Sequence, residues 1–335
     1  MLVCDSGCFS IGSWPDALIH DRRVADDKGL AREMRRVFNI SIYCTGGLLL
    51  LILLLPSCAT TQLHSTPPVH YYQNSSMPYH ADQHSNEHGL RVMTLNIAHG
   101  RGTSFHQLLL HSAEIVKNLD SINKLVNQAA PDIAAFQEID GPSFWSGNFN
   151  HVEYLASHSM FTRSIQASHV DAIGLSYGTA LISRQEMSNP QAVTFDPLLT
   201  LVPTGFVVST ISWPGKDSID IDVVSVHLDF LSGWVRKKQA DELIAVLRAR
   251  NNHLIIIMGD MNSGWQDSAP QYLVEKLGLK AYQPENSKLI TFPLLGKRLD
   301  WVLISPGLEF SSYEVIGTDI SDHRGVLAEL TLSSG

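Results

Sequence analysis

Six apolar segments of this 335-residue chain each carry polar side chains capable of chemistry at one of their ends. These side chains belong to Asn96, Glu138, His227, Asp260, Asn262, Asp300, Asp322 and His323. Carboxylates can hold a metal ion, and a histidine can move a proton near neutral pH. Because a charged group on a buried strand is costly unless it is paired or metal-bound, six such ends together favour a functional role over six unrelated turns or caps.

The segment HLIIIMGDMNS, residues 253–263, shows the two possible interpretations of these ends. Gly, Asp, Asn and Ser are common in turns, so a surface turn would explain the polar end. The alternative is a buried strand that delivers Asp260 and Asn262 to a reaction centre. In an extended chain these two side chains point the same way and Met261 points away, and we expect Gly259 to turn the backbone at the pocket floor. The five other segments with polar ends favour the strand.

Strands and helices alternate through the main body of the sequence. Apolar and β-branched runs between turn residues predict strands at residues 90–97, 132–139, 178–183, 206–213, 219–228, 253–259, 299–304 and 325–332. Apolar residues at helical spacing predict helices at residues 112–129, 148–158, 234–250 and 269–277. Since no repeat or linker-like break divides residues 90–333, we expect one α/β domain with helices packed outside sheets.

The motifs T-L-N, Q-E, S-V-H-L, G-D-M-N, L-D-W-V and S-D-H occur in this order along the body. Together they resemble the endonuclease/exonuclease/phosphatase superfamily, whose members have a deoxyribonuclease-I-like fold, and the resemblance covers residues 90–333. It implies an α/β fold, a four-layered α/β/β/α sandwich of two mixed β-sheets, with strand ends that converge on one edge. It also implies a phosphodiester hydrolase that depends on a divalent metal ion, usually Mg²⁺ (or Mn²⁺).

The resemblance implies metal binding or proton transfer for five residues. Glu138 is implied to be the principal metal ligand, with Asn96 and Asp322 as its partners. Oxygen ligands of this kind suit Mg²⁺, which takes one or two carboxylates and keeps several waters. His323 is implied to orient or deprotonate the attacking water, and Asp300 to hold this imidazole and stabilise its charged form.

The resemblance implies substrate contacts for four further residues. Asp260 and Asn262 are implied to position the nucleophile and the phosphate, and His227 to bind the phosphate or aid the leaving group. Tyr177 falls where family members often place a phosphate contact, and Arg101 in the loop 98–112 is a further candidate for phosphate binding. This mixture suits phosphodiester hydrolysis, in which charge builds on the equatorial and leaving oxygens.

Composition leaves the substrate open. The net charge is −9, and residues 1–57 hold six basic and six acidic residues, so the excess of acid lies in the rest of the chain. A protein that held long nucleic acid by electrostatics alone would normally be basic, and no basic run resembles a duplex-binding track. Nucleic acid and a lipid headgroup both remain possible substrates, the latter as in a sphingomyelinase-like or inositol-phosphate hydrolase.

Aromatic residues of the loops offer rims for the expected pocket. Trp145 and Phe149, in residues 140–150, either stack on a base or headgroup or pack their own loop down. Three further candidates for an apolar rim are Trp213, Trp234 and Trp265. Because the polar strand ends are intact, an enzyme is favoured over a catalytically silent binding module on the same fold, and we expect it to be a monomer.

The N-terminal region is typical of an exported lipoprotein. Arg35 and Arg36 precede the apolar run GGLLLLILLL at 46–55, which is shorter than the ~20 residues of a membrane-spanning helix. The following Leu-Pro-Ser-Cys58 resembles a bacterial lipobox, in which Cys58 would be lipidated. We therefore expect a lipid anchor that holds the protein on a membrane, facing the periplasm or the cell exterior; an uncleaved signal anchor is the alternative.

These features divide the sequence into four parts. They are an extension at residues 1–33 that we expect to be a start-site artefact, a signal and lipobox at 34–58, a flexible linker at 59–89 and the domain at 90–333. The three histidines spaced by four, His80, His84 and His88, belong to the polar linker rather than to a metal-binding helix. No cysteine follows Cys58, so we expect no disulfide in the domain.

Overall fold

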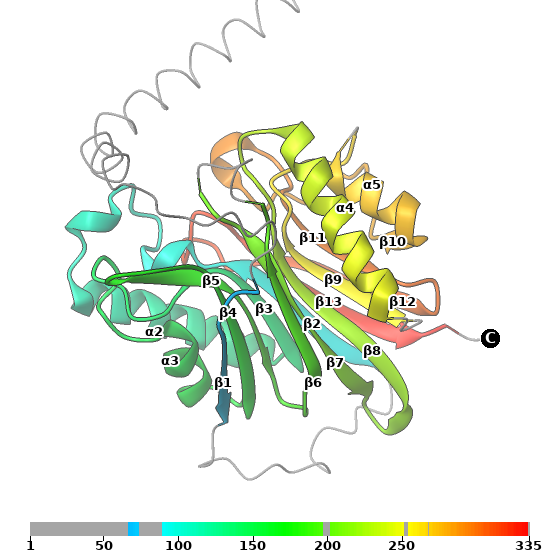
Figure 1. The fold of residues 1–335 in the computed structure, drawn as a ribbon, viewed down its shortest axis with the longest axis horizontal. Coiled ribbons are helices and arrows are strands. Elements are labelled where there is room, and N and C mark those ends of the chain that lie inside the picture. Colours follow the sequence, from blue (N-terminus) through cyan, green and yellow to red (C-terminus); the bar gives the residue numbers. More distant parts are fainter. Residues whose placement is uncertain (1–65, 74–88, 197–201, 251–253, 267, 334–335) are drawn as a thin grey trace, which may run out of the picture. The chain divides into compact units, whose positions relative to one another are not determined.

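The apolar segments of the sequence form two mixed β-sheets that pack face to face (Figure 1). The computed structural model describes residues 66–73, 89–196, 202–250, 254–266 and 268–333. All of them belong to one unit, which spans residues 62–335. The predicted signal, the lipidation site Cys58 and the three linker histidines lie outside the described residues.

Each sheet contains one parallel pair of neighbouring strands, and its other neighbours are antiparallel. The first sheet has the order β1 (Val69–Gln73), β4 (Arg163–Ala172), β5 (Leu175–Ser183), β3 (Ile133–Asp140), β2 (Leu90–Asn96), β13 (Gly325–Leu332) and β12 (Leu308–Ile316). The second has the order β10 (Lys280–Ala281), β11 (Asp300–Ile304), β9 (Leu254–Asp260), β8 (Lys216–His227), β7 (Gly205–Trp213) and β6 (Ser188–Thr194).

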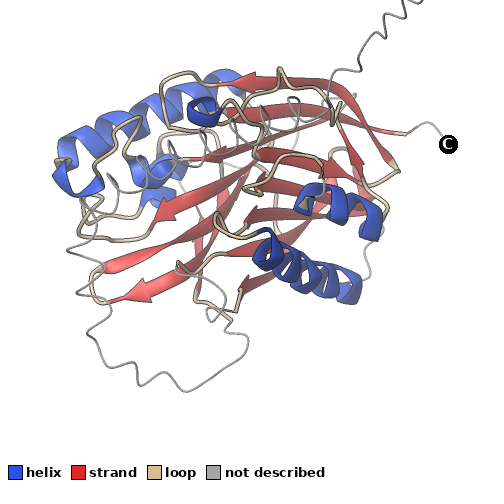
Figure 2. Cartoon of the chain, turned by 90° about the horizontal axis from the view of Figure 1, so that it is seen from above, coloured by secondary structure: helices blue, strands red, loops and turns tan. Residues whose placement is uncertain are grey.

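Helices cover the outer face of both sheets, as Figure 2 shows. They are α2 (Ser112–Ala129), α3 (His151–Ser157), α4 (Gly233–Arg250) and α5 (Ala269–Leu277), with 3-10 turns at Ala98–Gly100, Gln107–Leu109 and Pro293–Leu295. The apolar stripe of α2 packs on the first sheet, and that of α4 packs on the second. None of the helices in the described residues is long and apolar enough to cross a membrane.

Three apolar cores therefore separate four layers. The central core lies between the sheets and contains Val92, Ile133, Val223, Ile256, Met258 and Val302, all fully buried. The outer cores join α2 and α3 to one sheet and α4 and α5 to the other. Fully burying each Leu, Ile or Val contributes about 1.5–3 kcal/mol, so this layering supplies much of the stability of the fold. The predicted four-layered α/β/β/α sandwich is confirmed.

The domain begins earlier than the sequence indicates. We predict a flexible linker through residues 59–89, but β1 lies within it and pairs antiparallel with β4. Two aromatic residues of β1 have different exposures, since Tyr71 is exposed and Tyr72 packs against the core of α2 and α3. A short strand with mostly exposed side chains lacks the apolar pattern by which the other strands are recognised.

Candidate active site

The strand pairing brings the six predicted polar ends to one edge of the sandwich. In the second sheet, His227 of β8 pairs with Asp260 of β9, and Asp260 also pairs with Asp300 of β11. In the first sheet, β2 and β3 are parallel, so Asn96 and Glu138 lie at the same edge. β13 runs antiparallel to β2, so the segment just before it, with Asp322 and His323, reaches this edge too.

A pocket of about 300 Å³ opens where these ends converge. The predicted residues that line it are Glu138, Tyr177, His227, Asp260, Asn262, Asp322 and His323. Asn96 and Asp300 are fully buried and contact the lining residues from behind, and Arg101 contacts Asp322. All ten predicted residues of the domain are therefore brought to one place.

Glu138 reaches the pocket through a β-bulge. The register of β3 against β5 shifts between Gln137 and Ile139, and Glu138 has a positive φ of 49°. A bulge of this kind re-aims a side chain that regular alternation would point elsewhere. Asn96 Nδ2 donates to Glu138 Oε1 at 3.0 Å, while its Oδ1 accepts from the backbone N–H of Ala98. In this structure Asn96 therefore orients the carboxylate by donating to it.

The carboxyl group of Glu138 is ionised near neutral pH. Burial raises its pKa, but the nearby His99 and His227 and the hydrogen bond from Asn96 outweigh burial and lower the pKa to about 2. His99 Nε2 lies 3.4 Å from Glu138 Oε2, and His227 Nε2 lies 3.9 Å from Glu138 Oε1. Glu138 thus presents a negative charge to the pocket, as a metal ligand must.

Three buried residues at the pocket, Asp260, Asp300 and His323, lie in one continuous array. His323 Nδ1 donates to Asp300 Oδ2 at 2.9 Å, and His323 Nε2 lies 3.6 Å from Asp260 Oδ2. The sequence interpretation, in which Asp300 holds the imidazole of His323, matches this geometry. Thr291 fixes Asp300 in turn, because its Oγ1 accepts hydrogen bonds from the backbone N–H groups of Leu299 and Asp300.

Burial and neighbouring charges shift the pKa values of two members of the array. Burial lowers the pKa of His323, but Asp300 and Asp260 outweigh burial and raise it to about 10. Burial and the charge of Asp300 raise the pKa of Asp260 to about 6, although His323 opposes them. Since Asp260 and His323 interact strongly, they take up and release protons as a pair. A buried carboxyl group with a raised pKa therefore lies beside a histidine, an arrangement suited to proton transfer.

Asn262 links the array to His227. Its backbone N–H donates to Asp260 Oδ1 at 2.9 Å, and its side-chain Nδ2 donates to Leu228 O and lies 3.2 Å from His227 Nε2. The predicted orientation is confirmed, since Asp260 and Asn262 line the pocket and Met261 is buried in the core under α4. Asn262 has a positive φ of 47°, a conformation that costs energy in a non-glycine residue.

Gly259 does not turn the backbone as predicted. It lies inside β9, paired with Val226 of β8 and Trp301 of β11, and the strand continues to Asp260. A Cβ at this position would lie 1.9 Å from the carbonyl oxygen of Val226, and its φ is +149°. Glycine is therefore needed for the close approach of two strands, which places the carboxylate of Asp260 at the edge of the sheet.

Arg101 and Tyr177 have partners within the protein. Arg101 Nη2 donates to Asp322 Oδ2 at 2.5 Å, which neutralises a carboxylate of the pocket. Tyr177 lies edge-on to His99, with ring centroids 5.0 Å apart. Burial, together with the charges of Glu138 and Asp140, raises the pKa of Tyr177, so its hydroxyl keeps its proton and can donate to a phosphate oxygen.

The sequence interpretation missed a second histidine–carboxylate pair. His99 Nδ1 donates to Asp140 Oδ1 at 2.6 Å, and Trp145 Nε1 donates to Asp140 Oδ2 at 2.7 Å. His99 has a positive φ of 55° and lies three residues beyond the end of β2. Burial lowers the pKa of His99, but Asp140 and Glu138 outweigh burial and raise it above the ordinary value. The sequence signal was the motif Q-E-I-D, in which Asp140 follows Glu138 at an interval of two.

The donor set fits a divalent cation. Glu138 and Asp322 offer carboxylate oxygens on one side of the pocket. On the other side, Asp260, Asp300 and His323 place potential ligand atoms within 4.8 Å of one another, and Asp300 Oδ1 is buried without a hydrogen-bond partner in the described residues. Such oxygen-rich sets suit Mg²⁺ or Mn²⁺ better than softer metals.

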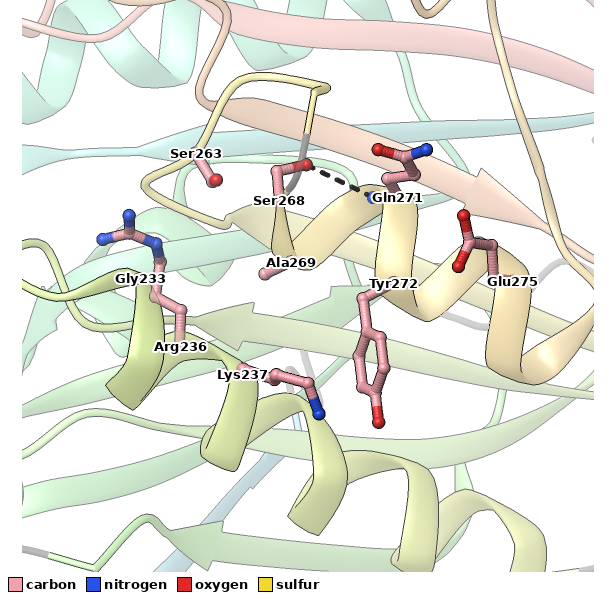
Figure 3. A pocket seen from close by; sticks show the side chains of 9 residues that line it. All are labelled: Gly233, Arg236, Lys237, Ser263, Ser268, Ala269, Gln271, Tyr272 and Glu275. Atoms are coloured by element: carbon pink, nitrogen blue, oxygen red, sulfur yellow. Dashed lines mark hydrogen bonds between the residues drawn. The ribbon is translucent and has the colours of Figure 1, made fainter.

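A second pocket, of about 290 Å³, lies between the N-terminal turns of α4 and α5 (Figure 3). None of the predicted site residues lines it. Its cations are already engaged: Arg236 Nη1 donates to Asp229 O, and Lys237 lies over the ring of Tyr272 and near Asp241. The carboxylates and histidines with strongly shifted pKa values, Glu138, Asp260 and His323, line the first pocket, so we assign the site there.

The prediction that three tryptophans form an apolar rim is wrong for Trp213 and Trp265. Trp213 is buried in the core between the sheets, and Trp265 packs against Trp301 in the core of α4 and α5. Trp234 alone of the three is exposed, with 60% of its surface accessible. Phe149 packs against Tyr154, which supports the interpretation that it holds its own loop down.

Comparison with known proteins gives one match by sequence. Residues 93–323 match the model of the Endonuclease/Exonuclease/phosphatase family. The matched segment runs from β2 to His323 and so contains every predicted site residue of the domain. No curated protein matches the chain by sequence.

Several solved structures share the fold. An endonuclease/exonuclease/phosphatase from Beutenbergia cavernae has a TM-score of 0.57 at 18% identity, covering 74% of this chain and 72% of its own. One from Bacteroides vulgatus has a TM-score of 0.57 at 16% identity, with 73% and 99% covered. The catalytic domain of human Nocturnin with a bound sulfate anion has a TM-score of 0.53 at 17% identity, with 80% and 100% covered. At these identities the likeness concerns the fold alone.

Proposed function

Because this chain belongs to the endonuclease/exonuclease/phosphatase family, we propose that it hydrolyses phosphodiesters with the help of a divalent metal ion. The observation that supports the proposal is that one pocket combines an ionised carboxylate with a group of residues able to transfer a proton. One half of the pocket holds the ionised carboxylate of Glu138, and the other holds the array of Asp260, His323 and Asp300. A negatively charged ligand beside a proton-transfer pair is what such hydrolysis requires.

The reaction adds water across one ester bond of the phosphate. The oxygen of the attacking water bonds to phosphorus, one P–O ester bond breaks, and the leaving alkoxide takes a proton. The products are a phosphomonoester and an alcohol. We assign both proton transfers to the pair of Asp260 and His323, which accepts the proton of the water and returns it to the leaving oxygen.

The other residues of the pocket orient the phosphate. Asn262 and His227 lie side by side at 3.2 Å and can donate to a non-bridging oxygen. Tyr177, which also lines the pocket, can donate to another phosphate oxygen. Fixed donors of this kind stabilise the charge that develops in the transition state.

Glu138 and Asp322 are the residues that we propose to hold the metal ion. The ion, when bound, would neutralise charge on the phosphate and make it more electrophilic. Asn96 would keep Glu138 in place by the hydrogen bond from its Nδ2. The cluster of Asp260, Asp300 and His323 is a second candidate for cation binding.

The test is hydrolysis of bis-p-nitrophenyl phosphate by the full chain with Mg²⁺ or Mn²⁺. We expect activity that EDTA abolishes and that either ion restores. A panel of plasmid DNA, RNA, sphingomyelin and inositol phosphates then separates the substrate classes. Activity that is unchanged in His323→Ala would overturn the assignment of the site.

We also propose that the enzyme is an exported lipoprotein. The support is the sequence Leu-Pro-Ser-Cys58 after a short apolar run. Expression in a bacterial host with a radiolabelled fatty acid should label the wild type, and Cys58→Ser should remove the label. Equal labelling of both proteins would contradict the lipid anchor.

A further inference from the structure

Large apolar side chains are exposed on both sides of the active-site pocket. We name the following set the apolar collar: Phe144, Ile173, Phe230, Leu231, Leu294 and Leu295. Their exposed fractions range from 45% for Leu231 to 105% for Ile173. Single exposed apolar residues are common, but a group around one opening indicates an interaction site.

The first side of the collar adjoins the half of the pocket that contains Glu138. Ile173 occupies the tip of the hairpin between β4 and β5, and the backbone N–H of Phe144 donates to Gly174 O at 2.9 Å. The ring of Phe144 contacts Trp145, and Trp145 contacts Tyr177, which lines the pocket. These contacts connect the loop of Phe144 and the hairpin tip with Ile173 to the wall of the pocket at Tyr177.

The second side of the collar adjoins the half of the pocket that contains His323. Phe230 lines the pocket, and Leu231 follows it in the loop between β8 and α4. Phe292 also lines the pocket and packs against the ring of His323 at 4.7 Å. Leu294 and Leu295 follow Phe292 in a 3-10 turn. The loops before α4 and before β11 lie at the same end of the second sheet (Figure 1).

We propose that the collar inserts into a lipid surface, so that the substrate is a lipid whose headgroup is joined by a phosphodiester. This inference rests on the proposed function. Apolar side chains of membrane-binding proteins enter the boundary between headgroups and acyl chains to a depth of about 5–10 Å. Such insertion would bring headgroup phosphates to the mouth of the pocket that the collar adjoins.

The composition of the collar favours a lipid over a nucleic acid. Single strands are held by a basic groove with aromatic platforms for the bases, whereas four of the six collar residues are aliphatic. The net charge of −9 also opposes the binding of a long polyanion. The exposed Lys297 lies two residues beyond Leu295, and a cation beside exposed apolar side chains is typical of surfaces that lie on phospholipid headgroups.

The experiment compares two substrates and two variants of the full chain. One substrate is soluble bis-p-nitrophenyl phosphate, and the other is vesicles of phosphatidylcholine containing sphingomyelin and phosphatidylinositol. The collar variant is I173N/L294N/L295N, which leaves the pocket lining intact. The control is Met160→Asn, because Met160 is also an exposed apolar residue and lies in the loop between α3 and β4, outside the collar.

We expect the collar variant to lose at least about tenfold of its activity on vesicles while its activity on the soluble diester stays within about twofold, since only the lipid surface contacts the collar. The control should match the wild type on both substrates. Equal losses on both substrates, no loss on vesicles, or a tenfold loss on single-stranded DNA instead would each overturn the proposal. A wild type that hydrolyses the soluble diester but no vesicle lipid would also overturn it.

A binding measurement separates this proposal from the proposed function. In a Cys58→Ser background, which removes the predicted lipid anchor from all samples, sedimentation with phosphatidylcholine vesicles should be lower for the collar variant than for the control. This difference needs no hydrolysis. An inactive protein with intact collar-dependent sedimentation would contradict the proposed function alone, whereas equal sedimentation would contradict the collar.

Discussion

Two histidine–carboxylate pairs adjoin the active-site pocket, one with its carboxylate on β11 of the second sheet and the other with its carboxylate on β3 of the first sheet. His323 donates through Nδ1 to Asp300 at 2.9 Å and turns Nε2 toward Asp260, whereas His99 donates to Asp140 at 2.6 Å and turns Nε2 toward Glu138. The chemical parts are the same, but the facing carboxylates differ. Asp260 has a raised pKa and can hold a proton, while Glu138 has a lowered pKa and stays charged.

The difference shows how one motif can serve two purposes. A histidine beside a carboxylate that accepts protons becomes part of a proton-transfer pair. A histidine beside a carboxylate that stays ionised orients it and stabilises its charge, as supporting residues around metal ligands do. We therefore assign proton transfer to His323 and Asp260, with Asp300 holding the imidazole of His323, and we assign positioning of Glu138 to the pair of His99 and Asp140.

The largest expected effect is from His323→Ala. It removes the proton-transfer group, so we expect kcat on bis-p-nitrophenyl phosphate to fall by about 1,000-fold or more. The measurement is steady-state kinetics at saturating Mg²⁺. Lys237→Ala is the matched control, because Lys237 lines the second pocket and lies outside the site; its activity should stay at the wild-type level. A loss below tenfold in His323→Ala would contradict the assignment.

The next effect is from Glu138→Gln, which keeps the shape of the side chain and removes its charge. We expect a loss of about 100–1,000-fold in activity, in the range typical for losing one metal-dependent charge interaction. Calorimetry should show weaker Mn²⁺ binding as well. Normal Mn²⁺ affinity in Glu138→Gln would move the metal site to the cluster of Asp260, Asp300 and His323.

A smaller loss is expected from His99→Phe and from Asp140→Asn. Each change removes support for Glu138 but leaves the proton-transfer pair intact, so we expect a loss of about 10–100-fold. The loss should appear with a raised Mn²⁺ dissociation constant, and the pH profile of kcat should keep its wild-type shape. A changed pH profile would mean that His99 itself transfers protons, and the two pairs would then be equivalent.

The sequence predicted the interior strands of both sheets better than the edges. Strands β2, β3, β5, β7, β8, β9, β11 and β13 correspond to predicted runs. The four edge strands, β1, β12, β10 and β6, were missed, as was β4 next to an edge. Edge strands are half exposed and often polar, so their sequences lack a continuous apolar run. In β6, SNPQAVT even contains a proline, which is tolerated at an edge.

The same physical difference explains which site residues were found. His323 and Asp300 adjoin apolar runs, so their polar character stands out in the sequence. His99 lies in a loop with a positive φ, where no periodicity applies. The bulge at Glu138 also breaks the alternation by which Asp140 would be recognised. Local backbone conformations of this kind are set by tertiary contacts, and sequence patterns therefore do not report them.

A further histidine of the pocket, His169, gives the smallest expected effect and sharpens the contrast. His169 has hydroxyl partners in place of carboxylates, with Thr194 Oγ1 at 3.1 Å and Thr179 Oγ1 at 2.9 Å. Burial, helped by the charge of His227, lowers its pKa to about 3. The unfolded chain, with a histidine pKa of about 6.5, takes up a proton that the folded protein does not. Stability from this residue is therefore full above pH 6.5 and falls as the pH drops toward 3.

Between pH 7 and pH 5.5 this linkage should lower the free energy of unfolding of the wild type by about 1.3 kcal/mol relative to His169→Gln, which lacks the titrating group. Urea unfolding at both pH values measures the difference. The control is His106→Gln, because His106 is exposed in the loop before α2, and it should follow the wild type. If the free energy of unfolding of His169→Gln depends on pH as that of the wild type does, His169 is protonated in the folded protein. Hydroxyl partners would then not suffice to keep a buried histidine of this pocket neutral.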